Sequence, residues 1–338
     1  MPDSASTSGA SFTIRAYRDR DERAILDLFA RSFPHAPRGV EHFRWKYREN
    51  PFGNEHISLA FDADARLVGH YAGYAVPFRI DGRDVLAHQI GDTMTDVAIR
   101  HIGRGPTSIL GRTALHFYEH FCDGRVAFNY GFNVANIQKF SLRFLRSDRV
   151  EPVMYRVRDL RAHPLAPLPR MQRWARGYQL ELVRETTAEF DELFARVAPA
   201  YRFLVRRDAR YLRWRYLDCP DTQYVVVAIR KWRTLVGWIA FRIRENRFVW
   251  GDALFDPDFA DAAEVVLRHV VPSYPVDAIE AWFPPRPAWF DATLRELAFE
   301  TRPEPQDLSV MCVPFALADA TARMRDGLYY TWGDSDLF

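Results

Sequence analysis

The chain has 338 residues, which exceeds one average domain and favours two. Hydrophobic residues make up 48% and charged residues 27% of it, a balance typical of globular proteins with well-filled cores. The 46 basic and 44 acidic residues leave a formal net charge of +2, which gives no reason to propose nucleic acid or an anionic membrane as a partner.

The three cysteines, Cys122, Cys219 and Cys312, are widely spaced and form no C-x-x-C pair. This usage indicates neither a disulfide framework nor a zinc site, and it fits a reducing, cytoplasmic compartment. Residues 1–11 are small and polar and are predicted to be a disordered tail rather than a signal peptide. No apolar run approaches the roughly 20 residues that cross a bilayer, so no membrane partner is expected.

The apolar pattern of the N-terminal half predicts strands and helices in a mixed order. A strand is predicted at residues 12–17, then a helix that carries Ile25, Leu28 and Phe29. The further predicted elements are a helix at 40–48, strands at 57–61, 67–80 and 85–97, a helix at 107–122, a strand at 125–129, a helix at 136–145 and a closing strand at 153–157.

Two glycines mark the turn between the strand that ends near Val97 and the next helix. Gly103 and Gly105 allow a ligand to approach the backbone closely, and Pro106 suits the first position of a helix. The free N–H groups at such a positive helix end are a natural seat for a pyrophosphate, and Arg100 and Arg104 add positive charge. An ordinary glycine turn before a helix is the alternative interpretation.

The spacing Arg100-x-x-Gly103-x-Gly105 resembles the Q/R-x-x-G-x-G/A signature of the GNAT superfamily of N-acetyltransferases, and the predicted element order is similar to that of this family over about residues 12–158. The resemblance implies that acetyl-CoA or another acyl-CoA binds as co-substrate, with its pyrophosphate at the turn and its pantetheine arm along the preceding strand. The implied pyrophosphate contacts are Ile102, Gly103, Arg104 and Gly105, with Arg100 as helper, and the implied pantetheine contacts are Thr95, Asp96 and Val97.

Acyl transfer to an amine needs a group that accepts the proton of the ammonium. Asp92 is the best candidate, and His88 projects from the same face of a regular strand, about 13 Å away, so the two would act through water or on different parts of one acceptor. A structural role is the alternative for both. Asp92 has a counterpart, Asp252, in the second half, and a histidine such as His88 is more often a satisfied or surface residue.

Many members of the family carry a tyrosine acid in the pattern N-x-x-A-x-x-x-Y-x-K-x-G-F. Phe140 occupies this position and cannot donate a proton, so either Tyr130 substitutes or the thiolate leaves without a dedicated acid. By the same resemblance Asn136 contacts the pantetheine amides, with a helix N-cap as its alternative role. His116 and His120 lie one helical turn apart, but they are expected to be solvated polar positions, and no metal is predicted.

The second half repeats landmarks of the first in the same order. A box of aromatic and basic residues recurs, and Leu-Val-Gly and Gly-Asp recur downstream of it, which indicates two copies of one fold. The matched landmarks are Phe43–Pro51 with Leu212–Pro220, Gly69 with Gly237, and Gly91-Asp92 with Gly251-Asp252. The boxes are interpreted as helix packing, with Trp and Tyr in the core and Arg at the rim.

The second copy lacks the glycine turn. Three carboxylates, Asp256, Asp258 and Asp261, stand in its place and would repel a pyrophosphate, so this copy is predicted to bind no CoA. Prolines between the copies favour an extended connector. The predicted division is a tail at 1–11, an N-terminal domain with the acyl-CoA loop at 12–160, a Pro-rich linker at 161–176 and a degenerate C-terminal domain at 177–338.

Together these patterns predict an α/β (α+β) protein of two tandem GNAT-like domains, each a mixed, mostly antiparallel twisted sheet flanked by helices. The expected activity is cytoplasmic, acyl-CoA-dependent N-acylation, chiefly N-acetylation, of a small-molecule primary amine such as an amino sugar or amino acid derivative. The alternative function is a non-catalytic CoA-binding sensor or scaffold. A monomer or a homodimer is expected.

Overall fold

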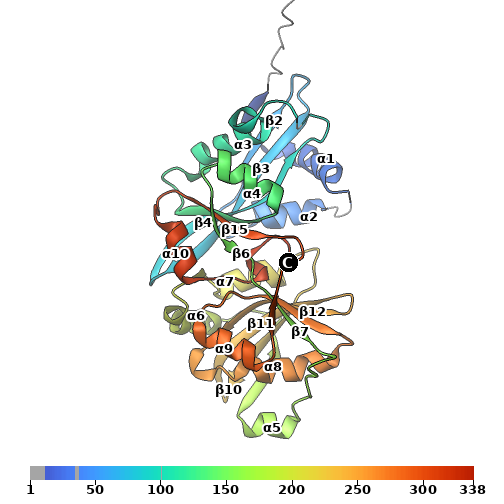
Figure 1. The fold of residues 1–338 in the computed structure, drawn as a ribbon, viewed down its shortest axis with the longest axis vertical. Coiled ribbons are helices and arrows are strands. Elements are labelled where there is room, and N and C mark those ends of the chain that lie inside the picture. Colours follow the sequence, from blue (N-terminus) through green and yellow to red (C-terminus); the bar gives the residue numbers. More distant parts are fainter. Residues whose placement is uncertain (1–11, 35–37, 100) are drawn as a thin grey trace, which may run out of the picture.

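The computed structural model describes residues 12–34, 38–99 and 101–338, and the predicted tail at 1–11 lies outside them. Two mixed, mostly antiparallel sheets with helices packed against them lie one above the other along the long axis of the molecule (Figure 1). The predicted fold class is therefore confirmed. In this part of the chain no helix is both long enough and apolar enough to span a bilayer.

The first half follows the predicted order closely, and the predicted bounds of the second and third strands agree with the structure. Its elements are β1 (Thr13–Ala16), α1 (Glu22–Ser32), α2 (Val40–Phe43), the π-helical turn η2 (Arg44–Arg48), β2 (Ile57–Phe61), β3 (Leu67–Ile80), β4 (Arg83–Thr95), the 3-10 turn η3 (Gly105–Thr107), α3 (Ile109–Phe117), the π-helical turn η4 (Tyr118–Cys122), β5 (Phe128–Asn133), α4 (Ala135–Phe144), β6 (Asp148–Pro152) and β7 (Tyr155–Asp159).

The helix after the glycines begins later than predicted. Ser108 caps α3, because its hydroxyl accepts a hydrogen bond from the N–H of Gly111 at 3.1 Å. Pro106 lies in the preceding turn η3 instead of the first turn of α3. The pattern of apolar residues therefore located the helix, but the capping serine sets its start.

The second half repeats the early elements of the first from β8 onward, after a short helix in the predicted linker. Its elements are α5 (Arg170–Ala175), β8 (Tyr178–Leu182), α6 (Ala188–Val197), η5 (Ala198–Ala200), β9 (Phe203–Val205), α7 (Ala209–Leu212), the π-helical turn η6 (Arg213–Leu217), β10 (Val225–Lys231), β11 (Thr234–Arg244), β12 (Arg247–Phe255), η7 (Pro257–Phe259), α8 (Ala262–Val270), η8 (Val271–Ser273), β13 (Ala278–Trp282), α9 (Ala288–Glu296), β14 (Glu300–Arg302), β15 (Ser309–Pro314), α10 (Ala320–Gly327), β16 (Leu328–Tyr329) and η9 (Trp332–Asp334).

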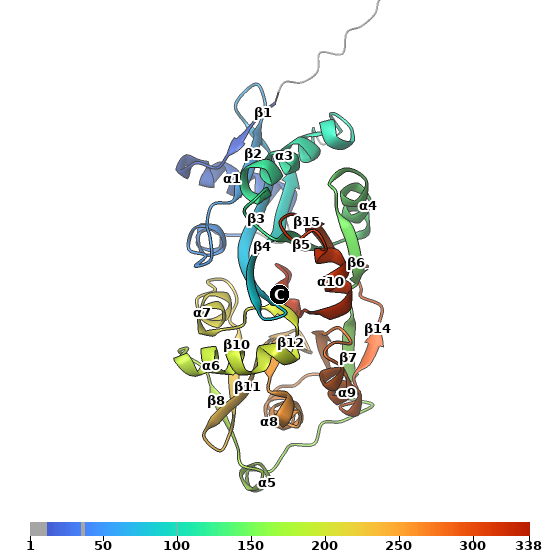
Figure 2. The ribbon, with the colours of Figure 1, turned by 90° about the vertical axis from the view of Figure 1, so that its left-hand side faces the viewer.

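Each half contributes at least one strand to the sheet of the other half. The first sheet has the order β1-β2-β3-β4-β5-β15-β6, and the second has the order β14-β7-β13-β12-β11-β10-β8. Figure 2 shows β15 beside β5 and β6 in the upper half, and β7 with β14 in the lower half. The prediction that residues 153–157 close the first sheet is therefore wrong. Alternation of apolar residues identifies a strand, but it does not say which sheet the strand joins.

A second connection joins the halves at the other end of β3. Strand β9 pairs antiparallel with β3 at Ile80 and Phe203, and β16 pairs parallel with β9. Because β9, β15 and β16 come from the second half and complete the first sheet, the chain cannot be cut near residue 160 without removing strands from both sheets.

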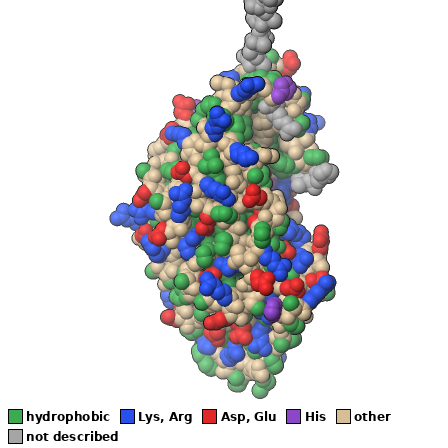
Figure 3. Space-filling view, in the orientation of Figure 1, with side chains coloured by type: hydrophobic (Ala, Val, Ile, Leu, Met, Phe, Trp, Pro, Cys, Tyr) green, Lys and Arg blue, Asp and Glu red, His purple; other side chains and the backbone are tan. Residues whose placement is uncertain are grey.

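Two stacked tryptophans relate the repeated boxes. The rings of Trp45 and Trp214 lie 5.3 Å apart, and each Nε1–H donates to the main-chain oxygen of the other residue, at 2.7 and 3.1 Å. The boxes thus form the contact between the copies. The prediction of arginines at the rim is wrong for Arg215, which is only 3% exposed, and Lys46 of the first box is equally buried. On the outer surface, charged side chains of both signs are intermixed on the face shown in Figure 3.

Candidate active site

Both glycines of the turn adopt backbone conformations that side chains disfavour. Gly103 has φ of +75° and Gly105 has φ of +56°. A Cβ at Gly103 would lie 2.6 Å from the oxygen of Thr107, and one at Gly105 would lie 2.7 Å from the Phe144 ring. The turn is therefore compact, and glycine is required at both positions.

The N–H groups of the turn are partly engaged within the protein. Ile102 N–H donates to the oxygen of Ile99 at 2.9 Å, so Ile102 is not available as the resemblance implied. Arg104 N–H has a long contact of 3.4 Å to Thr107 Oγ1. Among the described residues, the N–H groups of Gly103 and Gly105 have no acceptor. The predicted helper Arg100 lies outside the described residues.

A groove runs from this turn along the end of β4. This donor groove has a volume of about 420 Å³, and its lining includes Thr95, Val97, Gly103, Gly105, Ile137 and Phe140. Asp96 points elsewhere: its carboxylate pairs with Arg66 at 2.6 Å and accepts the N–H of Ala98 at 3.0 Å. Of the residues implied for the pantetheine arm on β4, Thr95 and Val97 lie along the groove, and the side chain of Asp96 holds the turn that follows β4.

The groove continues into a gap between two strands. β4 and β5 pair in parallel only from Ala87 with Phe128 to Gln89 with Tyr130. Beyond this pairing lies a cavity of about 180 Å³, the splay cavity, which shares Thr93, Leu110, Ile137 and Phe140 with the donor groove. The two spaces therefore adjoin, and their path leads from the glycine turn into the interior of the sheet.

Asp92 lies at a bulge in β4 that borders the splay cavity. It has φ of +49°, and the pairing with β3 skips from Ala72 with Gly91 to His70 with Met94. His70 donates its Nδ1–H to the oxygen of Asp92 at 2.7 Å. Burial lowers the pKa of His70 to about 4, so the ring stays neutral and holds the bulge as a simple hydrogen-bond donor.

Two donors bind one oxygen of the Asp92 carboxylate. Oδ2 accepts hydrogen bonds from Lys46 Nζ and from Tyr47 Oη, both at 2.7 Å. Burial would raise the pKa of Asp92, but the charge of Lys46 and these hydrogen bonds outweigh burial and hold the pKa well below its usual range. Asp92 therefore lines the cavity as predicted, but its geometry favours the structural alternative over proton abstraction.

The second copy contains a related arrangement, in which the tyrosine comes from the repeated box and the cation from outside it. Tyr216 Oη donates to Asp252 Oδ2 at 2.5 Å, and Arg207 Nε donates to Oδ1 at 2.8 Å. A carboxylate held by a tyrosine and a cation thus recurs in both copies, including the one without a glycine turn.

His88 does not share a face with Asp92. It is fully buried, and its Nε2 lies 2.7 Å from Nδ1 of His56, on the side of the sheet where it also contacts Phe117 of α3. Asp92 reaches Lys46 in η2 on the opposite side. The predicted alignment is therefore wrong, because the bulge shifts the alternation of side chains after Gly91. Burial lowers the pKa of His88 to about 3.

The other predicted residues have mixed outcomes. Tyr130 Oη donates to the oxygen of Asp334 at 3.2 Å, and Tyr130 is not among the residues that line the donor groove or the splay cavity. Asn136 is exposed within the first turn of α4, where Val134 is the N-cap, so it does not cap the helix, and it is not among the residues that line the donor groove or the splay cavity. Phe140 lines both spaces. His116 Nδ1 bonds with Ser58 Oγ at 2.8 Å.

Sequence reasoning missed three residues of the site. Lys46 and Tyr47 belong to the repeated box, and the tyrosine shared by both boxes, which binds the aspartate of Gly-Asp in each copy, was a usable signal. Asp336, which lines the splay cavity and lies 3.4 Å from Lys46, had no local signal because it comes from the far end of the chain.

Aromatic rings fill the corresponding gap in the second sheet. β12 and β13 pair only up to Trp250 with Ala281. By position relative to the two Gly-Asp pairs and strand pairings, Phe255 corresponds to Thr95 and Phe283 to Asn133. Phe290 of α9 lies 5.1 Å from Phe283 and 5.7 Å from Phe255, between ring centroids. These buried rings leave no room for a pantetheine arm, in agreement with the acidic turn.

The molecule is thus an α/β protein with two related sheets, of which the first keeps an open groove beside its glycine turn. Residues 13–141 match the family model described as an acetyltransferase (GNAT) domain. A comparison with curated protein sequences finds no match. Residues 13–141 thus form a GNAT acetyltransferase domain, which supports a GNAT-type acyltransferase.

Solved structures share the fold at low sequence identity. A protein of unknown function from Enterococcus faecalis, described as a probable N-acyltransferase, is 12% identical with a TM-score of 0.67, over 91% of this chain and 73% of that chain. A GCN5-related N-acetyltransferase from Kribbella flavida is 14% identical with a TM-score of 0.64, over 91% and 72%. N-myristoyltransferase from Saccharomyces cerevisiae, solved with bound myristoyl-CoA, is 12% identical with a TM-score of 0.57, over 93% and 81%.

Proposed function

We propose that this protein transfers an acetyl or other short acyl group from CoA to the primary amine of a small molecule, such as an amino sugar or an amino acid derivative. The observation that carries the proposal is the path from the glycine turn through the donor groove into the splay cavity. It offers an anion-binding end, an extended groove and a partly open reaction space in that order.

The groove fits an acyl-CoA donor. The N–H groups of Gly103 and Gly105 face the diphosphate, next to the N-terminus of α3, whose partial positive charge favours phosphate. The edge of β4 at Thr95 and Val97 pairs with the amides of the pantetheine arm as an added strand would. Ile137 and Phe140 form an apolar wall, and the thioester lies in the splay cavity beside the bulge.

The proposal assigns Asp92 a positioning role. Together with Lys46 and Tyr47 it fixes the bulge, which turns the backbone of Gly91 to Thr93 toward the thioester. His88 has no part in the reaction, and the second half contributes the wall of the reaction space rather than a second donor site. The near balance of charges favours small acceptors over basic protein tails.

Isothermal titration with acetyl-CoA tests the donor site directly. Wild-type protein binds acetyl-CoA, whereas Gly103→Glu abolishes binding, because its side chain brings negative charge to the diphosphate and overlaps Thr107. Gly39→Glu is the matched control, since Gly39 has open space around its Cβ position. Thiol release with a panel of amines then separates an enzyme from a CoA sensor. Phe140 at the position of the family's acid favours the sensor as the second candidate, which would bind acetyl-CoA without amine-dependent thiol release.

A further inference from the structure

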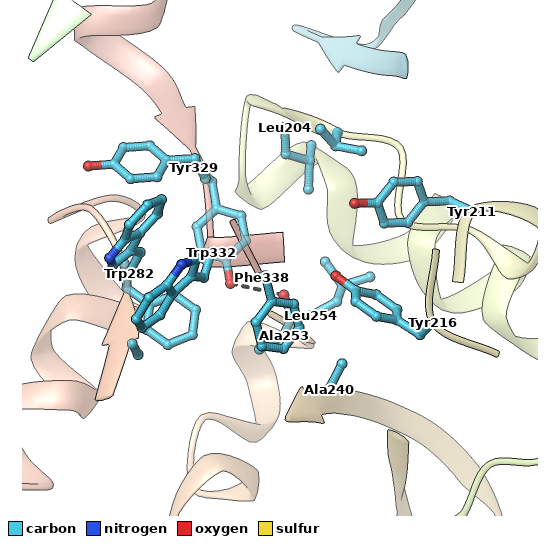
Figure 4. Close-up of a cluster of buried hydrophobic side chains, with 14 of the residues drawn as sticks. Leu204, Tyr211, Tyr216, Ala240, Ala253, Leu254, Trp282, Tyr329, Trp332 and Phe338 are labelled. Atoms are coloured by element: carbon cyan, nitrogen blue, oxygen red, sulfur yellow. Dashed lines mark hydrogen bonds between the residues drawn. The ribbon is translucent and has the colours of Figure 1, made fainter. Parts of the chain in front are cut away.

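The last residues of the chain cross the space between the two sheets. This crossing segment, residues 331–338, is buried apart from Asp336 and Leu337. Figure 4 shows Trp332 and Phe338 among aromatic side chains of the second half, and the rings of Trp332 and Trp282 stack 4.8 Å apart. The segment is thus an internal element of the fold.

Polar contacts fix the segment along its length. Asp334 Oδ2 accepts from Arg207 Nη2 at 2.6 Å, and the oxygen of Ser335 accepts from Arg215 Nη2 at 3.0 Å. Arg207 is fully buried and also binds Asp252. These cations come from the second half, so they hold the segment against that half while its outer side faces the first.

Asp336 is placed against the bulge of the first sheet. A Cβ at Gly91 would overlap Asp336 Oδ2, so the glycine allows the carboxylate to lie directly on β4. Asp336 lines the splay cavity, and it also lines a small cavity of about 20 Å³ between the halves, with Trp45 and Trp214. Asp336 is the one residue common to the described linings of these two cavities.

The two carboxylates of the splay cavity differ in their hydrogen bonding. Asp92 receives short hydrogen bonds from Lys46 and Tyr47. Asp336 has one long contact, 3.4 Å, to Lys46 Nζ, and its side chain is 23% exposed. A carboxylate oxygen has lone pairs for about two hydrogens, so Oδ2 of Asp92 is saturated, whereas both oxygens of Asp336 retain capacity to accept hydrogen bonds from a ligand.

We infer that Asp336 binds the ammonium of the acceptor and removes its first proton. The proton passes from the ammonium nitrogen to the Asp336 carboxylate, and the freed nitrogen lone pair forms a bond to the thioester carbon. The C–S bond then breaks with its electron pair going to sulfur, the nitrogen passes its second proton to the thiolate, and amide and CoA thiol leave while Asp336 releases the first proton to solvent. This inference rests on the proposed function and makes the site a product of both halves, since the carboxylate comes from the second and the donor groove from the first.

Two variants of Asp336 test the inference. Asp336→Asn keeps the shape of the side chain and removes its basicity, and it is expected to bind acetyl-CoA like wild type while kcat/KM for glucosamine, L-lysine or phenethylamine falls by about 100-fold or more. Asp336→Ala is expected to regain amine-dependent thiol release when millimolar formate is added, because formate supplies the missing carboxylate. Asp326→Asn is the matched control, since Asp326 is an exposed aspartate paired with Arg202 at the surface.

The outcomes separate the inference from the proposed function. Absence of acetyl-CoA binding, or of amine-dependent thiol release, in the wild-type protein refutes the proposed function and the inference with it. Normal binding with Asp336→Asn turnover within about threefold of wild type overturns the inference alone. A loss of turnover in Asp336→Ala that formate does not relieve also overturns it, because that result assigns Asp336 a structural role.

Discussion

Arg207 holds the crossing segment, and replacing it with methionine tests how the two halves are joined. Its guanidinium is 0% exposed and binds Asp252 at 2.8 Å and Asp334 at 2.6 Å, with Thr331 Oγ1 at 3.2 Å. Methionine fills much of the same volume but provides no charge. Arg207→Met therefore leaves two buried carboxylates facing each other without a cation.

The expected loss of stability is about 3–5 kcal/mol at neutral pH, the usual cost of leaving a buried charge without its partner. The loss depends on pH. Burial, together with the neighbouring charge of Asp252, raises the pKa of Asp334 to about 6 against the opposing charge of Arg207. Without the arginine the folded-state pKa rises more. A carboxyl with a raised folded pKa stabilises the fold at low pH and loses this contribution as pH rises through that pKa, so the variant is least impaired near pH 5.

Urea unfolding of wild type and Arg207→Met at pH 5 and pH 7.5 measures both effects. The difference in unfolding free energy between the two proteins is expected to be larger at pH 7.5. Adding Asp252→Asn and Asp334→Asn to Arg207→Met removes the uncompensated charges and is expected to recover part of the loss and abolish its pH dependence. A variant that loses less than about 1 kcal/mol at pH 7.5, or loses more at pH 5, contradicts the assigned role of Arg207.

Three further predictions follow from particular contacts. Gly91→Ala places a Cβ where Asp336 Oδ2 lies, so acyl transfer to the amine is expected to fall at least tenfold. Calorimetry is expected to show unchanged affinity for acetyl-CoA. Turnover equal to that of wild type would contradict the placement of Asp336. Residues 12–160 expressed alone lack β15 and are expected to give no cooperative urea transition, whereas the full chain gives a single one. The folded protein lowers the pKa of His70 to about 4 and that of His88 to about 3, so the free energy of unfolding is undiminished above pH 6.5 and falls by about 2 kcal/mol per histidine at pH 5. His88→Gln is expected to lessen this dependence of the unfolding free energy on pH. An unchanged dependence would contradict the role given to His88.

Local signals in the sequence were sufficient for the donor half of the site. The glycine spacing located Gly103 and Gly105, and alternation located β3 with its observed bounds. Both depend on neighbouring residues only. The repeated boxes indicated two copies, and the structure shows that their tryptophans stack on each other.

Features that depend on residues far apart in the chain could not be predicted from the sequence, for physical reasons. A single bulge at Asp92 reverses the side-chain alternation, which no pattern of residue types near His88 revealed. The exchange of β7 and β15 depends on which sheet edge each strand meets after folding. Asp336 enters the site only because Arg207 and Arg215 hold the crossing segment between the halves.

Amide hydrogen exchange with and without acetyl-CoA tests the central claim most directly. The claim is that the first copy alone holds the donor, through the glycine turn and the edge of β4. The account predicts slower exchange in peptides that cover residues 93–110 when acetyl-CoA is present, with no change in peptides that cover residues 252–262. Unchanged exchange across residues 93–110, or protection of residues 252–262 instead, would contradict it.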